Sequence, residues 1–258
     1  MSTFTPVTGG APEWLQRIFV WAAASVAACW IGLTMKALVQ APRVGVVCAV
    51  IGALTVTLIV AFANPSRQAF INGARWLGLG APRSLWPDRV SHPVARAAFR
   101  WTLWLAVAVA AGYLYVAIAT YITTPLFPPA ANLVDDRGSG YTGHGVAYVW
   151  CRQFIENGLS EELFFRAPLL AAYILVVEPI GRHGGRVRLA AWVLWSGLAL
   201  AMTVGFALSH GEYGLWNISH ALVMGTLNVG LLMASRSVWV PAIAHTTYNT
   251  LSAVGVVL

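Results

Sequence analysis

Two adjacent glutamates within an apolar stretch are the residues of this sequence best suited to acid–base chemistry. Glu161 and Glu162 lie in the segment 146–177, and Arg166 follows Glu162 at a spacing of four residues. In a helix this spacing places Glu162 and Arg166 on one face, where they can form an ion pair, whereas Glu161 points to another face. Glu161 has no obvious cationic partner, which is the profile of a general base. The alternative is a carboxylate that reaches the membrane interface.

Two histidines further along the chain each have a companion four residues away. They form the patterns Phe206-x-x-x-His210 and His245-x-x-x-Asn249, and the spacing puts each pair on one helix face. His245 and Asn249 then offer two neighbouring side-chain donors for an oxyanion, where helix bonds occupy the backbone amides. A single histidine in a membrane helix is more often a hydrogen-bonded packing residue. Two of them together with an unpaired glutamate favour catalysis.

A third histidine belongs to a polar stripe along one predicted helix. Asn217, His220, Met224 and Asn228 recur at helical spacing, and hydrogen bonds between neighbouring helices explain such a stripe adequately. His220 and Asn217 are therefore secondary candidates, and His220 could line a cavity or offer a further nitrogen to a metal.

The composition predicts that these residues lie on helices that span a membrane. Of 258 residues, 58% are apolar, and only 16 Lys and Arg and 9 Asp and Glu carry charge, whereas about a quarter of the residues of soluble domains are charged. We therefore expect an all-α, polytopic transmembrane helical bundle that forms a single membrane domain over residues 1–258. About seven segments are long enough to cross the hydrocarbon core: 18–35, 44–63, 101–124, 146–177, 189–209, 215–234 and 237–258.

The basic residues and the cysteines narrow the function classes. The chain has 15 Arg and one Lys, Lys36, without a basic run, so nucleic acid is not an expected partner. Cys29, Cys48 and Cys151 show neither metal-ligand spacing nor an even number, which excludes a disulfide framework. One set of alternate loops holds eleven Lys and Arg and the other only three, so the positive-inside rule places the N-terminus in the cytoplasm. The Arg-rich, Lys-poor composition indicates a bacterial plasma membrane.

The segment 146–177 is too long for one straight crossing, and Pro168 favours a break in it. A helix rise of about 1.5 Å per residue places Glu161 and His245 roughly 10 Å from the inner face, but His210 roughly 30 Å from the cytoplasmic start of its span. We therefore expect the fourth or fifth segment to be broken, tilted or re-entrant if these residues meet.

Taken in order, Glu161-Glu162-x-x-x-Arg166, Phe206-x-x-x-His210 and His245-x-x-x-Asn249 resemble the CPBP family, which comprises the CAAX prenyl proteases and the bacterial Abi-type membrane proteases. The resemblance covers a protease-like core at residues 145–255. It implies an intramembrane glutamic endopeptidase in which Glu161 and His210 activate water for attack on a peptide bond. It further implies that His245 and Asn249 stabilise the oxyanion, that Glu162, Arg166 and Phe206 give structural support, and that no cofactor is needed. Its partners would be a membrane-associated peptide or protein substrate and the lipid bilayer.

Three alternatives stay open. The same residues could form a zinc protease with His210, His245 and Glu161 as ligands, although no helical His-Glu-x-x-His pattern is present. Buried Glu, His and Arg residues also occur in transporters, which usually have repeated halves that this sequence lacks. A non-catalytic scaffold or immunity protein is the third alternative.

Overall fold

Apolar helices account for most of the described chain. The computed structural model describes residues 13–63, 67–84, 92–129, 141, 143–180 and 185–254, and within these ranges the regular elements are all helices. Five helical stretches are long and apolar enough to cross a membrane: Glu13–Gln40, Pro93–Leu126, Val146–Ile180, Gly185–Leu208 and Gly211–Ser235. The protein is thus a helical membrane bundle, as the sequence predicts.

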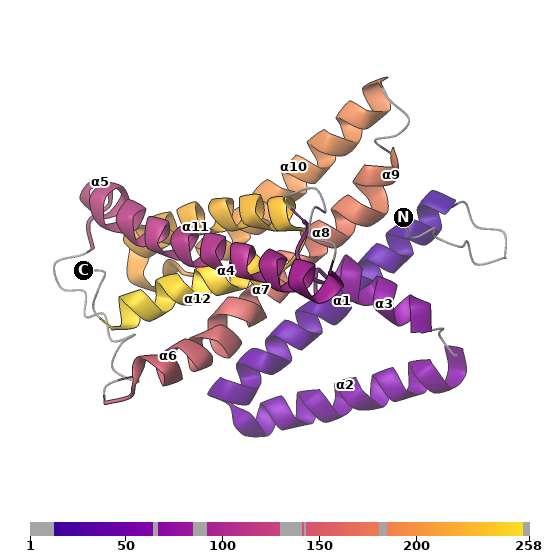
Figure 1. Cartoon of the computed structure of the whole chain (residues 1–258), viewed down its shortest axis with the longest axis horizontal. Helices are drawn as coiled ribbons and strands as arrows, with labels where there is room; N and C mark the ends of the chain where they lie inside the picture. The colour runs from indigo at the N-terminus through magenta and orange to yellow at the C-terminus, as the bar shows by residue number, and fades with distance from the viewer. Residues whose placement is uncertain are drawn as a thin grey trace.

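Figure 1 shows how these helices are arranged, with a long central helix flanked by the others. The central helix consists of α6 (Val146–Gln153), η3 (Phe154–Leu159), α7 (Ser160–Phe165), α8 (Ala167–Ala172), η4 (Tyr173–Val177) and α9 (Glu178–Ile180). The flanking elements are α1 (Glu13–Gln40), α2 (Pro42–Ala63), α3 (Arg67–Trp76), α4 (Pro93–Ile118), η1 (Ala119–Thr123), α5 (Thr124–Leu126), α10 (Gly185–Leu208), η6 (Gly211–Tyr213), α11 (Gly214–Ser235) and α12 (Trp239–Ala253).

The number of seven crossings stays a prediction. Two of the predicted segments correspond to α2, whose described apolar part Pro42–Val56 is short, and to α12. The 15 residues of α12 extend for only about 22 Å, which is less than the roughly 30 Å of the hydrocarbon core. Residues 255–258 of the last predicted segment lie outside the described residues.

The central helix is the most enclosed part of the bundle. In its most apolar window 56% of the residues are buried, compared with 11% to 39% in the other four candidate spans. It contains two π-helical turns, η3 and η4, and its regularity is interrupted at Arg166, where φ is −111°. The break predicted near Pro168 is therefore a local distortion of one continuous helix, because a helix with proline can keep its direction where neighbouring side chains satisfy the freed carbonyls. The Sγ of Cys29 lies 3.7 Å from the carbonyl oxygen of Phe164.

Two glycines allow neighbouring helices to approach the central helix closely. A Cβ atom on Gly32 of α1 would overlap the carbonyl oxygen of Ser160, and one on Gly158 would overlap the side chain of Thr246 on α12. Small residues permit this kind of backbone approach between membrane helices. The glycines thus fix α1 and α12 on two sides of the segment that carries Glu161.

The turn between α11 and α12 is buried within the protein. Ser237 and Val238 are fully buried. The Ser237 hydroxyl donates to the carbonyl oxygens of Gly78 and Gly80, both at 3.1 Å. The backbone N–H of Val238 also donates to the carbonyl oxygen of Gly78, at 3.0 Å. Because the segment 77–80 covers this turn, α12 begins inside the bundle.

Candidate active site

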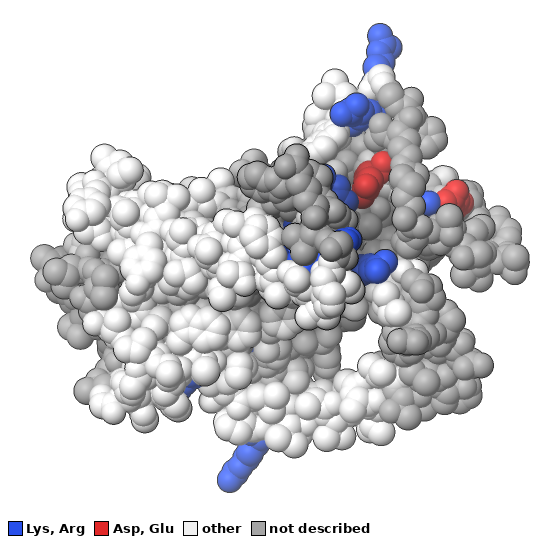
Figure 2. All heavy atoms as spheres, viewed as in Figure 1, with Lys and Arg blue, Asp and Glu red and all other residues white. Residues whose placement is uncertain are grey.

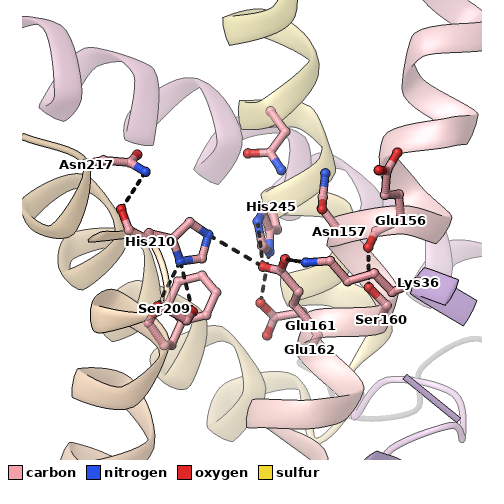
Figure 3. Close-up of polar contacts among 12 residues, drawn as sticks. Lys36, Glu156, Asn157, Ser160, Glu161, Glu162, Ser209, His210, Asn217 and His245 are labelled. Atoms are coloured by element: carbon pink, nitrogen blue, oxygen red, sulfur yellow. Dashed lines mark hydrogen bonds and ion pairs between the residues drawn. The ribbon is translucent and has the colours of Figure 1, made fainter. Parts of the chain in front are cut away.

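The structure brings together three residues that the sequence analysis singled out as catalytic. The Nε2 atom of His210 lies 3.7 Å from Oε2 of Glu161, and Nε2 of His245 lies 3.9 Å from the same oxygen. Figure 3 shows the two rings near the Glu161 carboxylate, that of His210 coming from the turn after α10 and that of His245 from α12. This oxygen has no hydrogen-bond partner among the described residues. A water molecule at this position could donate hydrogen bonds to both the carboxylate and a histidine nitrogen.

His210 is held in one tautomer by the end of α10. Its Nδ1 lies 2.8 Å from the backbone carbonyl oxygen of Phe206. Since a carbonyl can only accept, Nδ1 carries the proton and Nε2 of the neutral ring is an acceptor facing Glu161. The amide Nδ2 of Asn217 donates to the backbone carbonyl of His210 at 2.8 Å, which ties the turn between α10 and α11 to the site.

Burial is the main reason why the pKa of His210 lies below its usual value, since the charged imidazolium is poorly solvated there. His210 lies in the turn between two candidate spans. The negative charge of Glu161 opposes this lowering, while the charges of His245 and Lys36 add to it.

His245 is anchored beneath Glu161 by a buried hydrogen-bond network. Its Nδ1 lies 3.2 Å from Oε1 of Glu162, so Nδ1 donates to that carboxylate. The other ring nitrogen, Nε2, faces Glu161. The same Glu162 oxygen accepts from the amide of Asn228 at 2.8 Å, and Asn228 accepts from the hydroxyl of Tyr115 at 2.6 Å. The network thus joins α4, α11 and α12 to the central helix at the candidate site.

Arg166 lies on the same buried side as Glu162. Its Nε lies 3.4 Å from Oε2 of Glu162, which is the ion pair that the spacing of four predicts. The guanidinium also lies over the ring of Phe206, 4.1 Å from its centroid, a favourable cation–π arrangement. Phe206 therefore connects Arg166 to α10, the helix that the turn with His210 follows.

The expectation that Glu161 lacks a cationic partner is wrong. Nζ of Lys36, on α1, lies 2.9 Å from Oε1 of Glu161. The spacing along the chain could not reveal this contact, because the two residues are 125 positions apart. One carboxylate oxygen is thus paired with an ammonium group, and the other faces the two histidines.

A cavity of about 590 Å³ opens beside Glu161. It is lined by Gly32, Leu33, Lys36, Gln40, Tyr141, Gln153, Glu156, Asn157, Ser160, Glu161, Phe164, Phe165, Ser209, His210, Glu212, Asn217, Tyr248, Asn249, Ser252 and Ala253. The lining thus combines many polar side chains with the two aromatic rings of Phe164 and Phe165. The space is large enough for an extended peptide segment together with water.

The remaining candidates fall in two places. Asn249 lies in the cavity wall, where its amide Nδ2 is 3.4 Å from Oε1 of Gln153. His220 is buried behind this wall. Its Nδ1 lies 3.3 Å from the hydroxyl of Tyr248, which does line the cavity, and its Nε2 lies 3.2 Å from the hydroxyl of Thr124. Asn217 lies in the wall as well. The structure therefore separates His220 from the cluster around Glu161.

Several polar residues of the cavity were not among the candidates predicted from the sequence. Lys36 is the only lysine of the chain, a signal that could have marked it. Asn157 donates to Gln153 at 2.6 Å, and Glu156 accepts from Gln40 and Arg152 at 3.0 and 3.2 Å. Helical spacing alone could have placed Gln153, Glu156 and Asn157 on the central helix near Glu161.

The expected depth of Glu161 below the inner face stays a prediction. Glu161 lies 19 residues before Ile180, which is about 28 Å along the helix. The central helix is one continuous stretch, Val146–Ile180, that extends three residues beyond the predicted span 146–177. His210 and Glu161 therefore meet without a re-entrant segment.

Within the described part of the chain, no group of three or more His, Cys, Asp and Glu side chains is arranged to hold a metal ion. The residues that do converge are one carboxylate and two imidazoles.

The fold and the site together define a multi-pass membrane protein with a polar pocket built around a buried carboxylate and two histidines. Residues 143–251 match the family model of the Rce1-like type II CAAX prenyl endopeptidases. This match is to a protease family, and together with the apolar helices it supports a membrane-embedded peptidase that acts on a peptide or protein. No curated protein and no solved structure matches the chain.

Proposed function

We propose that the protein is an intramembrane endopeptidase in which Glu161 and His210 activate a water molecule for attack on a peptide bond. The observation that carries this proposal is the 3.7 Å approach of His210 Nε2 to the Glu161 oxygen that has no hydrogen-bond partner. Water held between them loses a proton to the carboxylate as its oxygen attacks the carbonyl carbon. The same proton then passes to the leaving amine.

We further propose that Asn249 and His245 stabilise the oxyanion that forms during this attack. Asn249 lies in the cavity wall, where its amide can reach a bound substrate. His245 is 1% exposed and lies one layer deeper, so its Nε2 reaches the cavity only beside Glu161. Because Nδ1 donates to Glu162, Nε2 would donate to the oxyanion in the imidazolium form, which carries a proton on both ring nitrogens. Positioned donors of this kind typically stabilise a transition state by several kcal/mol.

Glu162, Arg166 and Phe206 would act as supports. Glu162 fixes the ring of His245, and Arg166 balances the charge of Glu162 while resting on Phe206. A buried carboxylate without these partners would be strongly destabilising, so loss of a supporting residue would disturb the position of the histidines.

The test compares wild-type protein with Glu161→Gln and with the control Glu178→Gln in detergent. Glu178 lies on the same long helix and pairs with Arg236 at 2.9 Å, far from the cavity. Cleavage of a peptide library is followed by mass spectrometry, and folding by thermal melting. We expect Glu161→Gln to lose at least about 100-fold in activity, with Glu178→Gln close to wild type. Normal activity of a folded Glu161→Gln protein would refute the proposal.

The same assay with a chelator separates the two enzyme mechanisms. Cleavage by Glu161 and His210 acting directly on water resists a chelator. Zinc held by Glu161, His210 and His245 would instead activate the water, and a chelator would then abolish cleavage until zinc is restored.

A further inference from the structure

Basic residues are concentrated at one end of the bundle. The segments 1–17, 64–100, 178–188 and 235–237, predicted from the sequence to lie on one side of the membrane, hold eleven Lys and Arg, whereas the alternate segments hold only Lys36, Arg43 and Arg137. Arg89, Arg137 and Arg182 lie outside the described residues. Figure 2 shows basic side chains gathered over the end of the molecule where α9 and α10 meet and where α1 begins.

The cavity lies toward the opposite end of the helices. Gln40 is the last residue of α1, His210 and Glu212 lie in the turn that follows α10, and Ser252 lies near the end of α12. Each of these helices begins at the Arg-rich end and reaches the cavity with its last turns. Tyr141, which precedes the central helix, lines the same mouth.

Between the cavity and the Arg-rich end the described helices are packed against one another. Gly32 of α1 lies directly against Ser160, and below this contact Leu163, Ala167 and Leu170 belong to a buried hydrophobic cluster shared with α1 and α10. The lining of the cavity thus stops at the level of Phe164 and Phe165. Beyond them the central helix is closed off by this apolar cluster and by the fully buried ion pair of Glu162 and Arg166.

We propose that the active-site cavity opens on the extracytoplasmic side of the membrane, and that the substrate is a peptide segment presented from that side. Arg-rich loops stay in the cytoplasm, so the opposite end, which carries Gln40, Tyr141 and Glu212, faces outward. The substrate part of this inference rests on the proposed function, whereas the orientation does not. An exported or translocated chain has access to this cavity, and a peptide anchored in the cytoplasmic leaflet does not.

The orientation is tested by labelling single cysteines in intact bacterial cells that express the full chain. Cys29, Cys48 and Cys151 are first replaced by Ser, and Glu212→Cys or Arg188→Cys is then introduced. Both positions are exposed, the first at the cavity mouth and the second near the start of α10. A membrane-impermeant maleimide should label Glu212→Cys before permeabilisation and Arg188→Cys only afterwards.

Labelling of Arg188→Cys in intact cells, alone or together with Glu212→Cys, would overturn the orientation. Glu212→Cys that reacts only after permeabilisation would overturn it as well. The substrate side is tested with a peptide that the detergent-solubilised protein cleaves: right-side-out vesicles should cleave it, and inside-out vesicles should not. Labelling needs no catalysis, so an inactive protein would refute the proposed function and leave the orientation standing.

Discussion

Lys36 and Glu161 form an ion pair between α1 and the central helix, with Nζ 2.9 Å from Oε1. The other oxygen of the same carboxylate faces the two histidines at 3.7 and 3.9 Å. Lys36 lies outside the residues that match the protease family, 143–251. The N-terminal helix therefore supplies the charge that fixes how the candidate general base points.

Replacement of Lys36 by Met should lower kcat/KM by about 10-fold, since a hydrogen bond to a charged group is worth about 1.5–3 kcal/mol and partial exposure of Lys36 reduces this. Lys36→Arg keeps the positive charge and should restore most of the activity. Steady-state kinetics on a cleaved peptide measures both variants.

Arg43→Met is the matched control, because Arg43 is an exposed cation at the start of α2. It should keep wild-type kinetics. Equal activity of wild type and a folded Lys36→Met protein would show that the ion pair has no role in positioning Glu161.

Asn249→Ala should lower kcat by about 100-fold or more while KM changes little, because an oxyanion donor acts in the transition state rather than on bound substrate. Asn249 lies in the cavity wall on α12. The nearby Ser252→Ala variant, on the same helix and in the same wall, should retain kcat within about threefold. A rise in KM at unchanged kcat would instead make Asn249 a substrate-binding residue.

The sequence predicted the class of fold and most of the cluster, because both depend on local patterns. Apolar length indicates membrane helices, and spacings of four residues place Glu162 with Arg166 and His245 with Asn249 on common faces. The order of these motifs was sufficient to indicate the protease family that residues 143–251 match.

Contacts between distant segments could not be predicted in this way. The pairing of Lys36 with Glu161 depends on the close approach of α1, which Gly32 permits. The depth of His245 depends on a turn at Ser237 that is buried under the segment 77–80. Neither contact leaves a periodic signal in the sequence, since each joins residues more than a hundred positions apart.

Asn228→Ala should reduce both stability and activity, because it removes the link between Tyr115 and Glu162. A buried donor or acceptor that loses its partner costs about 1–3 kcal/mol. Here the Tyr115 hydroxyl loses its acceptor, and Oε1 of Glu162 keeps only the hydrogen bond from His245. The melting temperature in detergent should fall by several degrees.

Thr226→Ala on the same helix is the control for Asn228→Ala. Thr226 is exposed, and its hydroxyl bonds only to the carbonyl of Leu222 within α11, so the melting temperature should stay near that of wild type. An Asn228→Ala protein with unchanged melting and unchanged kinetics would mean that His245 is held without this network.

The dependence of activity on pH should reflect the neutral form of His210. Burial places the pKa of His210 below the usual value, which is about 6.5. As the pH falls through that lowered pKa, the ring gains a proton on Nε2 and can no longer accept a hydrogen bond from water. Activity should therefore persist below pH 6.5 and decline only at more acidic pH.

The measurement is kcat/KM between about pH 4.5 and 8, with thermal melts at each pH to exclude unfolding. If kcat/KM of the folded protein already declines above pH 6.5, the environment of His210 does not favour its neutral form, and its role in accepting from water is wrong.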